Sequence, residues 1–390
     1  MAKKLSGKLV VFCFLIFLVI GAVLGVAGQI FVFAESYEIP AKEQAIQHIA
    51  VGDTSAEVIK NQDLSIHFVE LGNKYTGDCT LIKVGSTEVL IDAGSRASSV
   101  QPIYDYVSDY VDGILDYVIV THAHQDHYAG FATENGLFDK FNIGTIVTFS
   151  KTNQKETAKL YSAFKSALGR AEQSEGVLSN VYTVLECYNS SVAGAEREYN
   201  LGNNVSLQFL YQEFYETKAP SENDYSVCCM INQNDTNYYL FTGDLEKEGE
   251  ESLVTSYRNE YGVDLPKVVL YKAGHHGSKT SSSDALLSKI DPDIVCVCCC
   301  AGSSEYTSNT ANQFPTQEFI NRIAPHTSQV YVTTLCLDYN KGSYQSFNGN
   351  IVVYANASNQ VSVACANNNM VLKDTEWFKN NRTCPDAWKS

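Results

Sequence analysis

The chain is short of positive charge, and of charge in general. Lys and Arg number 28 against 44 Asp and Glu, so the formal net charge is -16, and charged residues make up 18% of the chain. A negative net charge is the wrong sign for a protein that binds nucleic acid by neutralising phosphates over a broad surface. Because 45% of the residues are hydrophobic, the low charge does not indicate disorder, and we expect a substantial buried core.

Internal repeats and low-complexity tracts are absent as well. Beyond the first 34 residues the chain is long enough for one large α/β domain with an appendage, or for two smaller domains. Period-2 apolar patterns come first as hairpins and are later interleaved with helical patterns. This order predicts two sheets sandwiched between helical layers.

The amino-terminal segment carries no charge after its first lysines. Lys3, Lys4 and Lys8 precede an apolar run over residues 9–34, which is longer than the ~20 residues needed to span a bilayer and the ~7–15 of a cleaved signal. We therefore expect residues 1–34 to be a single-pass signal anchor, with the body outside the cell membrane and residues 35–62 as a juxtamembrane stalk. Cleavage near Ala34, which would give a secreted protein, stays an alternative.

Cysteine is plentiful, with 12 residues, but its spacing does not indicate a disulfide framework. Residues 228–229 and 296–300 lie in apolar runs that read as buried strands, where cysteine acts as a small hydrophobe. Cys296 and Cys299 have a Cys-x-x-Cys spacing, but strand alternation sends them to opposite faces. We expect core packing here, while pairing of Cys365 with Cys384 stays open.

Histidine is scarce, and its distribution is uneven. The chain has 8 His, and three of them, His122, His124 and His127, stand with Asp126 directly after the apolar run 117–120. Neutral imidazole nitrogens and a carboxylate oxygen suit zinc, with manganese or iron also acceptable. The pattern predicts a metal site at the end of a strand.

Two more predicted strands end in candidate ligands. Asp244 follows the run 238–242, where it could bridge two ions or cap the next helix. His275 and His276 follow the run 268–272. Because two adjacent histidines do not easily face one metal, we expect one to bind the ion and the other to donate a proton or a hydrogen bond to the substrate.

Together these segments resemble the metallo-β-lactamase superfamily and, within it, the metallo-hydrolase domain of ComEC-type competence proteins. The motifs that carry the resemblance are His122-x-His124-x-Asp126-His127, Gly243-Asp244, Lys272-Ala273-Gly274-His275-His276-Gly277-Ser278-Lys279, Gly77-Asp78-Cys79-Thr80-Leu81-Ile82 and Leu90-Ile91-Asp92-Ala93-Gly94. The resemblance implies an αββα sandwich with the metal site at one edge between the sheets. We expect this hydrolase domain over residues 63–336 and a small C-terminal β-hairpin extension and tail over 337–390.

The resemblance also implies a role for each site residue. The implied ligands are His122 and His124 for a first ion, Asp126, His127 and His275 for a second, and Asp244 as the bridge. Many members have another histidine before the bridging aspartate, whereas residues 221–227 here resemble the asparagine-bearing segment of ComEC-type domains. One or two divalent ions, zinc or manganese, are therefore expected. Asp126 and His276 are the expected catalytic groups, and Ser278 and Lys279 the expected substrate contacts.

Three functions are compatible with these residues. We expect a surface-anchored, metal-dependent hydrolase of a phosphodiester, in which the ion lowers the pKa of its water toward ~7. A hydrolase of another bond, such as a phosphorylcholine ester on cell-wall polymers or a lactam, is the first alternative, because one fold hosts all of these reactions. A catalytically silent surface binding module is the second, although such a module has no chemical need for a His/Asp shell.

Overall fold

The computed structural model describes residues 47–48, 56–172 and 180–389. The anchor expected over residues 1–34 lies outside these ranges, as does most of the stalk expected over 35–62. Within the described ranges, no helix has both the length and the apolarity that a membrane crossing needs.

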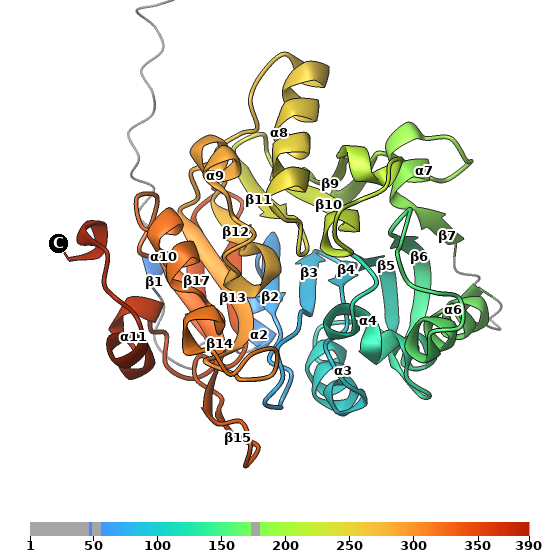
Figure 1. Ribbon diagram of the computed structural model, residues 1–390. Coiled ribbons are helices and arrows are strands. Elements are labelled where there is room, and N and C mark those ends of the chain that lie inside the picture. Colours follow the sequence, from blue (N-terminus) through green and yellow to red (C-terminus); the bar gives the residue numbers. More distant parts are fainter. Residues whose placement is uncertain (1–46, 49–55, 173–179, 390) are drawn as a thin grey trace, which may run out of the picture. The chain divides into compact units, whose positions relative to one another are not determined.

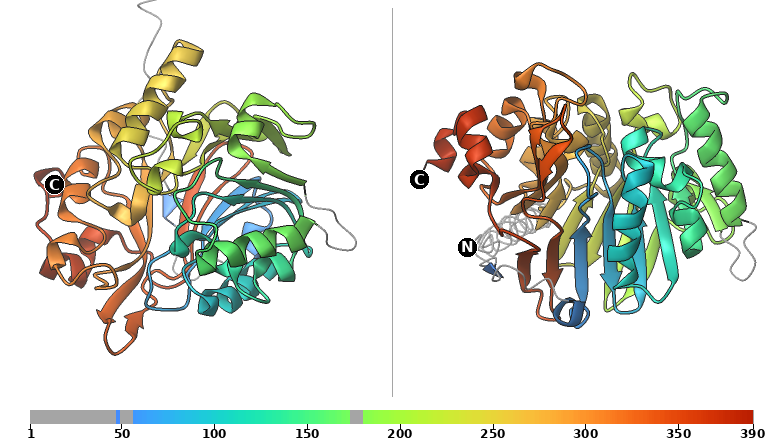
Figure 2. Two further views of the ribbon diagram at one scale, coloured as in Figure 1. Left: turned by 45° about the vertical axis from the view of Figure 1, so that its right-hand side comes forward. Right: turned by 90° about the horizontal axis from the view of Figure 1, so that it is seen from below.

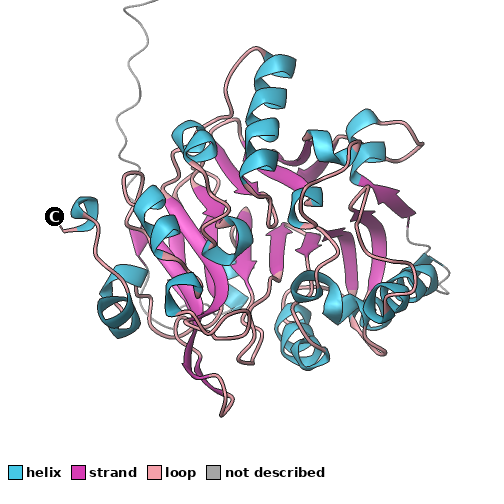
Figure 3. Ribbon diagram, viewed as in Figure 1, coloured by secondary structure: helices cyan, strands magenta, loops and turns pink. Residues whose placement is uncertain are grey.

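Two sheets form the centre of the fold (Figure 3). The first has the strand order β1-β17-β16-β2-β3-β4-β5-β6-β7. Its strands are β1 Gln47–His48, β2 Leu64–Phe68, β3 Thr80–Val84, β4 Thr87–Ile91, β5 Ile114–Val120, β6 Asn142–Thr148, β7 Asn180–Thr183, β16 Ile351–Ala355 and β17 Val361–Cys365. The pairs from β4 to β7 are parallel, while β2, β3 and β4 form an antiparallel meander.

The second sheet has the order β15-β14-β13-β12-β11-β10-β9-β8. Its strands are β8 Glu198–Gly202, β9 Val205–Leu210, β10 Cys228–Gln233, β11 Asn237–Phe241, β12 Leu270–Lys272, β13 Ile294–Ala301, β14 Val330–Asp338 and β15 Ser343–Gln345. The pairs from β11 to β14 are parallel. Each sheet therefore has a parallel part whose carboxyl ends can carry a site.

Helices pack beside both sheets. They are α2 Ala56–Ile59, α3 Val100–Ser108, α4 Gln125–Ala132, α5 Leu137–Lys140, α6 Lys159–Glu172, α7 Val184–Asn189, α8 Lys247–Tyr261, α9 Asp284–Ile290, α10 Gln317–Ile323 and α11 Glu376–Asn381. Figure 1 shows α3, α4 and α6 beside β4 to β6, and α8, α9 and α10 beside β11 to β13. The predicted arrangement of two sheets between helical layers is confirmed.

Alternate side chains of the second sheet face two different cores. In β13, Cys296 and Cys298 belong to the larger core, which contains apolar side chains of both sheets. Val297 and Cys299 belong to a second core, which contains side chains of α8, α9 and α10. A strand buried on both faces reads as a continuous apolar run, which explains the cysteine-rich segment. Cys296 and Cys299 do lie on opposite faces, as the alternation predicted.

The cysteines of the described ranges are all free thiols, Cys365 and Cys384 included. His67 is fully buried in β2 between the hydroxyls of Tyr106 and Ser65, at 2.9 and 2.8 Å. Burial, with a smaller effect of Lys83, lowers the pKa of His67 to about 3. This histidine is neutral in the folded protein and belongs to the core.

The carboxyl-terminal segment is not the appendage that its sequence suggested. The domain boundary expected at residue 336 falls inside β14, and the strands on either side of residues 346–350, β15 and β16, do not pair as a hairpin. Instead β15 pairs with β14 in the second sheet, whereas β16 pairs with β2 and β17 in the first. The two strands that flank residues 346–350 thus complete different sheets.

The tail after β17 packs on the helices of the second sheet. The Trp388 indole donates to the carbonyl of Thr327 at 2.9 Å, and Arg382 donates to the carbonyl of Pro315 at 3.0 Å. Phe378 and Trp388 are both buried in the second core. Figure 2 shows this segment, in red, beside the orange helices. The aromatic tail therefore covers the body of the domain.

Candidate metal centre

Polar loops from both sheets meet at one edge of the sandwich. Asp92 follows β4, and His122 to His127 follow β5, which is the parallel neighbour of β4. In the other sheet Asp244 follows β11, and His276 follows the parallel neighbour β12. Since the carboxyl ends of parallel strands lie at the same edge of a sheet, these four strand ends gather their side chains between the two sheets.

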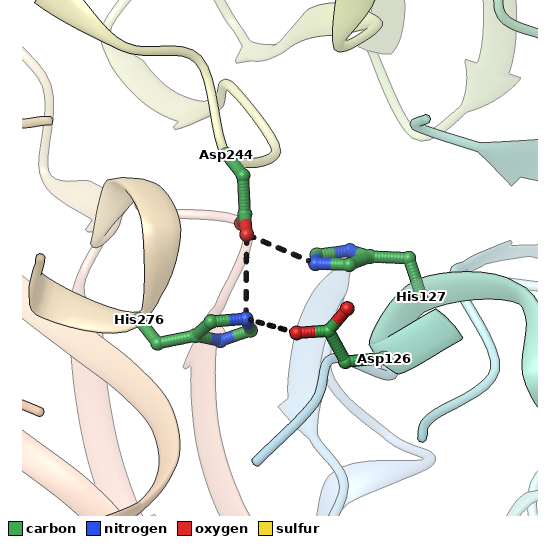
Figure 4. A group of neighbouring side chains, drawn as sticks. All are labelled: Asp126, His127, Asp244 and His276. Carbon is green, nitrogen blue, oxygen red and sulfur yellow. Dashed lines mark hydrogen bonds and ion pairs between the residues drawn. The ribbon is translucent and has the colours of Figure 1, made fainter. Parts of the chain in front are cut away.

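The centre of the site is a cluster of Asp126, His127, Asp244 and His276, whose ligand atoms lie within 4.8 Å of one another (Figure 4). Asp244 Oδ2 is 3.1 Å from His127 Nε2 and 3.3 Å from His276 Nε2. His276 Nε2 is also 3.3 Å from Asp126 Oδ2. The two imidazoles and two carboxylates therefore converge on one small volume, which we call the four-residue cluster.

In each histidine of the cluster, Nε2 faces the other cluster residues and Nδ1 has a partner outside the cluster. His127 Nδ1 lies 2.7 Å from Asp92 Oδ2, and the same carboxylate accepts hydrogen bonds from Thr121. His276 Nδ1 donates to the carbonyl of Cys298 at 2.9 Å and lies 3.2 Å from Asp78 Oδ1. Partners of this kind fix the tautomer and ring orientation of a metal-binding histidine and leave Nε2 for the ion.

The electrostatics of the site favour a bound cation. The site contains four acidic side chains, of which Asp78, Asp92 and Asp244 are buried and Asp126 is largely buried. The ammonium of Lys272, at the end of β12, forms ion pairs with Asp78 and Asp244. Burial opposes protonation of His127, but Asp244 and Asp92 outweigh it and raise its pKa well above the usual value. The same balance, with Asp244 and Asp78, raises the pKa of His276. The carboxylates thus draw positive charge onto the imidazoles.

The residues present fit a divalent ion. His127 Nε2 is buried and faces the cluster, where its contact is the Asp244 carboxylate at 3.1 Å. Two nitrogen and two oxygen donors are a set that zinc accepts, and manganese also binds such ligands. A divalent cation would also offset the excess of buried carboxylates, which otherwise costs folding free energy.

His122 and His124, expected to hold a first ion, lie beside the four-residue cluster and not in it. His122 Nε2 and His124 Nδ1 are 3.0 Å apart, and the His122 ring lies 4.2 Å from that of His127. Burial, with a smaller effect of His127, lowers the pKa of His122 well below the usual value, so its ring is neutral. A neutral imidazole is the form that binds a metal, and the pair is close enough to the cluster to border a second ion.

The structure exchanges the places expected for His275 and His276. His276 is fully buried in the cluster, whereas the His275 side chain is 21% exposed and sits 3.4 Å from Glu246 Oε1 and 3.1 Å from Thr280 Oγ1. Both residues have a left-handed backbone, with φ of 46° and 53°, in the turn Gly274–Gly277. This sharp turn after β12 points the first histidine outward and the second inward, so His276 takes the place in the cluster that was expected for His275.

The two expected substrate contacts also lie outside the cluster. Ser278 is buried and its hydroxyl pairs with Thr280 Oγ1 at 3.0 Å, while exposed Lys279 donates to Asn312 at 3.0 Å. Asn223, from the asparagine-bearing segment, donates to Glu246 at 3.1 Å and lies 3.4 Å from His275 Nδ1. Asn223 therefore lies beside His275, and Ser278 is linked to His275 through Thr280.

Four residues that support or contact the site were missed as site residues. Asp78, Asp92 and Lys272 were recognised only as parts of motifs. For Asp92 and Lys272 the signal was position, because each stands at the carboxyl end of an apolar run, as the ligands do, whereas Asp78 stands just before β3. Tyr306, whose hydroxyl donates to Asp126 Oδ2 at 2.6 Å, carried no signal, since it lies in a polar loop far along the chain.

The αββα sandwich, with a His/Asp cluster between the sheets, places the chain in the metallo-β-lactamase superfamily as a metal-dependent hydrolase. More narrowly, the sequence model of the family described as anti-Pycsar protein Apyc1 matches residues 69–271. Because this match covers more than half of the 390 residues, the chain belongs to that family.

Two curated proteins are similar to parts of the chain. Competence protein ComA of Neisseria gonorrhoeae is 40% identical over 96 residues, which cover 25% of this chain and 12% of that protein. Recombination protein 2 of Haemophilus influenzae is 26% identical over 224 residues, which cover 57% of this chain and 23% of that protein. The chain thus spans less than a quarter of the length of either relative.

Solved structures with a similar fold include two further proteins. The metallo-β-lactamase fold protein YhfI from Bacillus subtilis matches with a TM-score of 0.39 and 9% identity, over 69% of this chain and 95% of that one. A long form RNase Z from yeast matches with a TM-score of 0.38 and 14% identity, over 64% of this chain and 39% of that one.

Proposed function

We propose that the protein hydrolyses a phosphodiester at the four-residue cluster, using one or two divalent ions, zinc or manganese. The observation that carries the proposal is the convergence of Asp126, His127, Asp244 and His276 at one edge of the sandwich. An ion held there would lower the pKa of its water toward ~7 and polarise a phosphoryl oxygen. The name of one curated relative, recombination protein 2, refers to a process that acts on phosphodiester bonds, and this favours a phosphodiester over a lactam.

The residues of the chain divide into those that hold the ion and those that face the substrate. His127 and His276 offer Nε2, and Asp126 and Asp244 offer carboxylate oxygens. Lys272 donates to the carbonyl of Gly243 at 3.0 Å and lies 3.4 Å from Asp244 Oδ1, so it orients this carboxylate. A second ion, if bound, would take His122 and His124 as its ligands.

His275 lies on the substrate side of this arrangement. Its ring is partly exposed and lies 5.5 Å from that of Phe314, and its Nδ1 faces Glu246. Held in this way, the imidazole can donate a hydrogen bond to an oxygen of a phosphoryl group bound at the cluster. We therefore assign His275 to substrate binding and His276 to the metal.

The test is an assay of the purified full-length chain against bis-p-nitrophenyl phosphate, p-nitrophenyl phosphorylcholine and nitrocefin. We expect hydrolysis of the first, loss of that activity with chelator and recovery with zinc or manganese. Asp244→Asn should be inactive, while Asp235→Asn, in a turn away from the cluster, should behave as wild type. Cleavage of nitrocefin alone would replace the substrate class, whereas cleavage of p-nitrophenyl phosphorylcholine alone, which is itself a phosphodiester, would narrow the substrate to phosphorylcholine diesters. A metal-loaded chain inactive on all three would favour the binding module.

We also propose that residues 1–34 anchor the protein in the cell membrane with the body outside. The support is the uncharged run of residues 9–34 behind Lys3, Lys4 and Lys8. Protease added to intact cells should then degrade the body, and detergent should not be needed for this. Complete protection until the cells are lysed would reverse the orientation, and release of the body into the medium would indicate cleavage near Ala34.

A further inference from the structure

The side chain of Tyr306 has the opposite orientation from that of an ordinary surface tyrosine. The residue is 55% exposed, yet its hydroxyl reaches into the site and donates to Asp126 Oδ2 at 2.6 Å. A surface tyrosine usually buries its apolar ring and leaves its polar tip in water. Here the ring is largely in water, so burial of apolar surface does not explain the placement.

The carboxylate oxygen that Tyr306 contacts is the one that belongs to the cluster. Asp126 Oδ2 is also 3.3 Å from His276 Nε2. The Tyr306 hydroxyl therefore stands at the solvent side of the four-residue cluster.

The loop that carries Tyr306 is held firmly by its neighbour. Glu305 forms an ion pair with Arg96 at 2.7 Å and accepts a hydrogen bond from the backbone of Thr76 at 2.8 Å, and its side chain is 5% exposed. Thr76 stands two residues before Asp78, so this hydrogen bond links the loop to the segment whose Asp78 contacts His276. The Tyr306 ring itself contacts Phe314 at 5.8 Å between centroids. The contacts of Glu305 therefore fix the loop next to Tyr306, and the tyrosine side chain extends from this fixed point to the cluster.

We propose that Tyr306 is a catalytic residue that donates a hydrogen bond to a phosphoryl oxygen of the substrate at the cluster. With substrate bound, the Tyr306 hydroxyl would donate to the substrate and no longer to Asp126, because the Asp126 oxygen that it contacts would bind the ion. The tyrosine keeps its proton throughout, and no covalent bond forms or breaks at its oxygen. The donor acts by stabilising the negative charge that builds up on the phosphoryl oxygens. The inference rests on the proposed function, since it needs a phosphoryl group at the cluster.

Two variants separate this role from a structural one. Tyr306→Phe removes only the hydroxyl, and Tyr261→Phe is the matched control, because Tyr261, at the end of α8, is 40% exposed and its hydroxyl contacts Gln208 and Arg197, which are not part of the cluster. Three quantities are measured on the full chain. They are the zinc and manganese dissociation constants, the affinity of the metal-loaded protein for inorganic phosphate by calorimetry, and kcat and KM for bis-p-nitrophenyl phosphate.

For Tyr306→Phe we expect metal affinity equal to that of wild type and a kcat lower by ~10²–10³, the cost of losing one positioned donor. Phosphate should bind roughly 10-fold more weakly, since hydrogen bonds to charged groups have about this worth. Tyr261→Phe should match wild type in all three quantities.

Three results would overturn the inference. One is a metal affinity that falls by ~10–100-fold with normal kcat at saturating metal, which would make Tyr306 a support for Asp126. Another is no change in phosphate affinity or kcat. The third is a metal-loaded wild type that binds no phosphate. If wild type binds phosphate but does not cleave the diester, the proposed function fails, and the inference is then judged by phosphate affinity alone.

Discussion

His276→Ala is expected to lose the metal and the activity together, whereas His275→Ala should keep the metal. The reason is geometric, because His276 Nε2 lies 3.3 Å from both Asp126 and Asp244, while His275 points toward Glu246 and Thr280. Removing one donor of the cluster and leaving its two carboxylates facing each other should weaken metal binding by more than ~100-fold, beyond the effect of losing an outer partner. Losing the His275 hydrogen bond should lower turnover by roughly 10- to 100-fold.

The measurement combines metal analysis after dialysis with the rate on bis-p-nitrophenyl phosphate at saturating zinc or manganese. His326→Ala is the matched control, since His326 is a similarly shielded histidine that pairs with Asp291 at 3.0 Å, away from the cluster. It should keep both metal and activity. If His275→Ala loses the metal and His276→Ala retains it, His275 is the ligand, and the assignment of His276 to the metal is refuted.

The exchange of these two histidines shows where sequence reasoning ended. The apolar run before them predicted a strand, and β12 ends at Lys272. Which of two adjacent side chains faces inward depends on the turn that follows, and here two non-glycine residues adopt a left-handed backbone. Such conformations are uncommon for residues with a side chain, and no pattern in the sequence announces them. The strand could be predicted, but the direction of the ligand could not.

Elements with strong periodicity were predictable for the opposite reason. β13 has eight consecutive buried residues, and its alternation between two cores is a property of any strand covered on both faces. By contrast, residues 181–186 carry an apolar pattern that is typical of a strand, yet β7 ends at Thr183. There the side chains of Thr183 and Glu186 form a capping box, and a helix begins. A local polar signal overrode the apolar pattern.

The carboxyl-terminal strands failed as a prediction because they depend on distant partners. β15 and β16 are separated by a short loop, which is typical of a hairpin. Yet β16 finds its partner in β2, more than 280 positions earlier, with Val353 opposite Ile66. Apolar alternation gives a strand but not its neighbour, so pairing over such a distance cannot be read from the residues.

Lys272→Met is expected to lower the free energy of unfolding by about 3–5 kcal/mol in the presence of chelator, as is usual when one member of a buried ion pair is removed. The Lys272 side chain is 4% exposed and forms ion pairs with Asp78 and, at 3.4 Å, with Asp244. Methionine fills a similar volume but leaves both carboxylates without their cation. Lys279→Met is the control, because that exposed side chain bonds only to Asn312, and its loss should stay within about 0.5 kcal/mol.

The free energy of unfolding that Lys272→Met loses should depend on pH in one direction. Burial raises the pKa of Asp78, and the ammonium of Lys272 together with His276 outweighs it and holds that pKa below its usual value. Without Lys272 the burial effect dominates, so the folded-state pKa of Asp78 should rise above its unfolded value. A group of this kind contributes stability at low pH that is lost as pH rises through its folded pKa. Urea unfolding of Lys272→Met should therefore show a smaller deficit near pH 5 than near pH 8.

A double variant isolates the pair itself. Adding Asp78→Asn to Lys272→Met removes one of the two orphaned charges, and it should recover part of the lost stability because the two residues are in contact. It should also flatten the pH dependence, since the group that titrates is gone. A deficit that is equally large at pH 5 and pH 8, and unchanged by Asp78→Asn, would mean that Lys272 stabilises the fold through the packing of its stem. In that case its ammonium would have no part in holding the carboxylates that face the metal site.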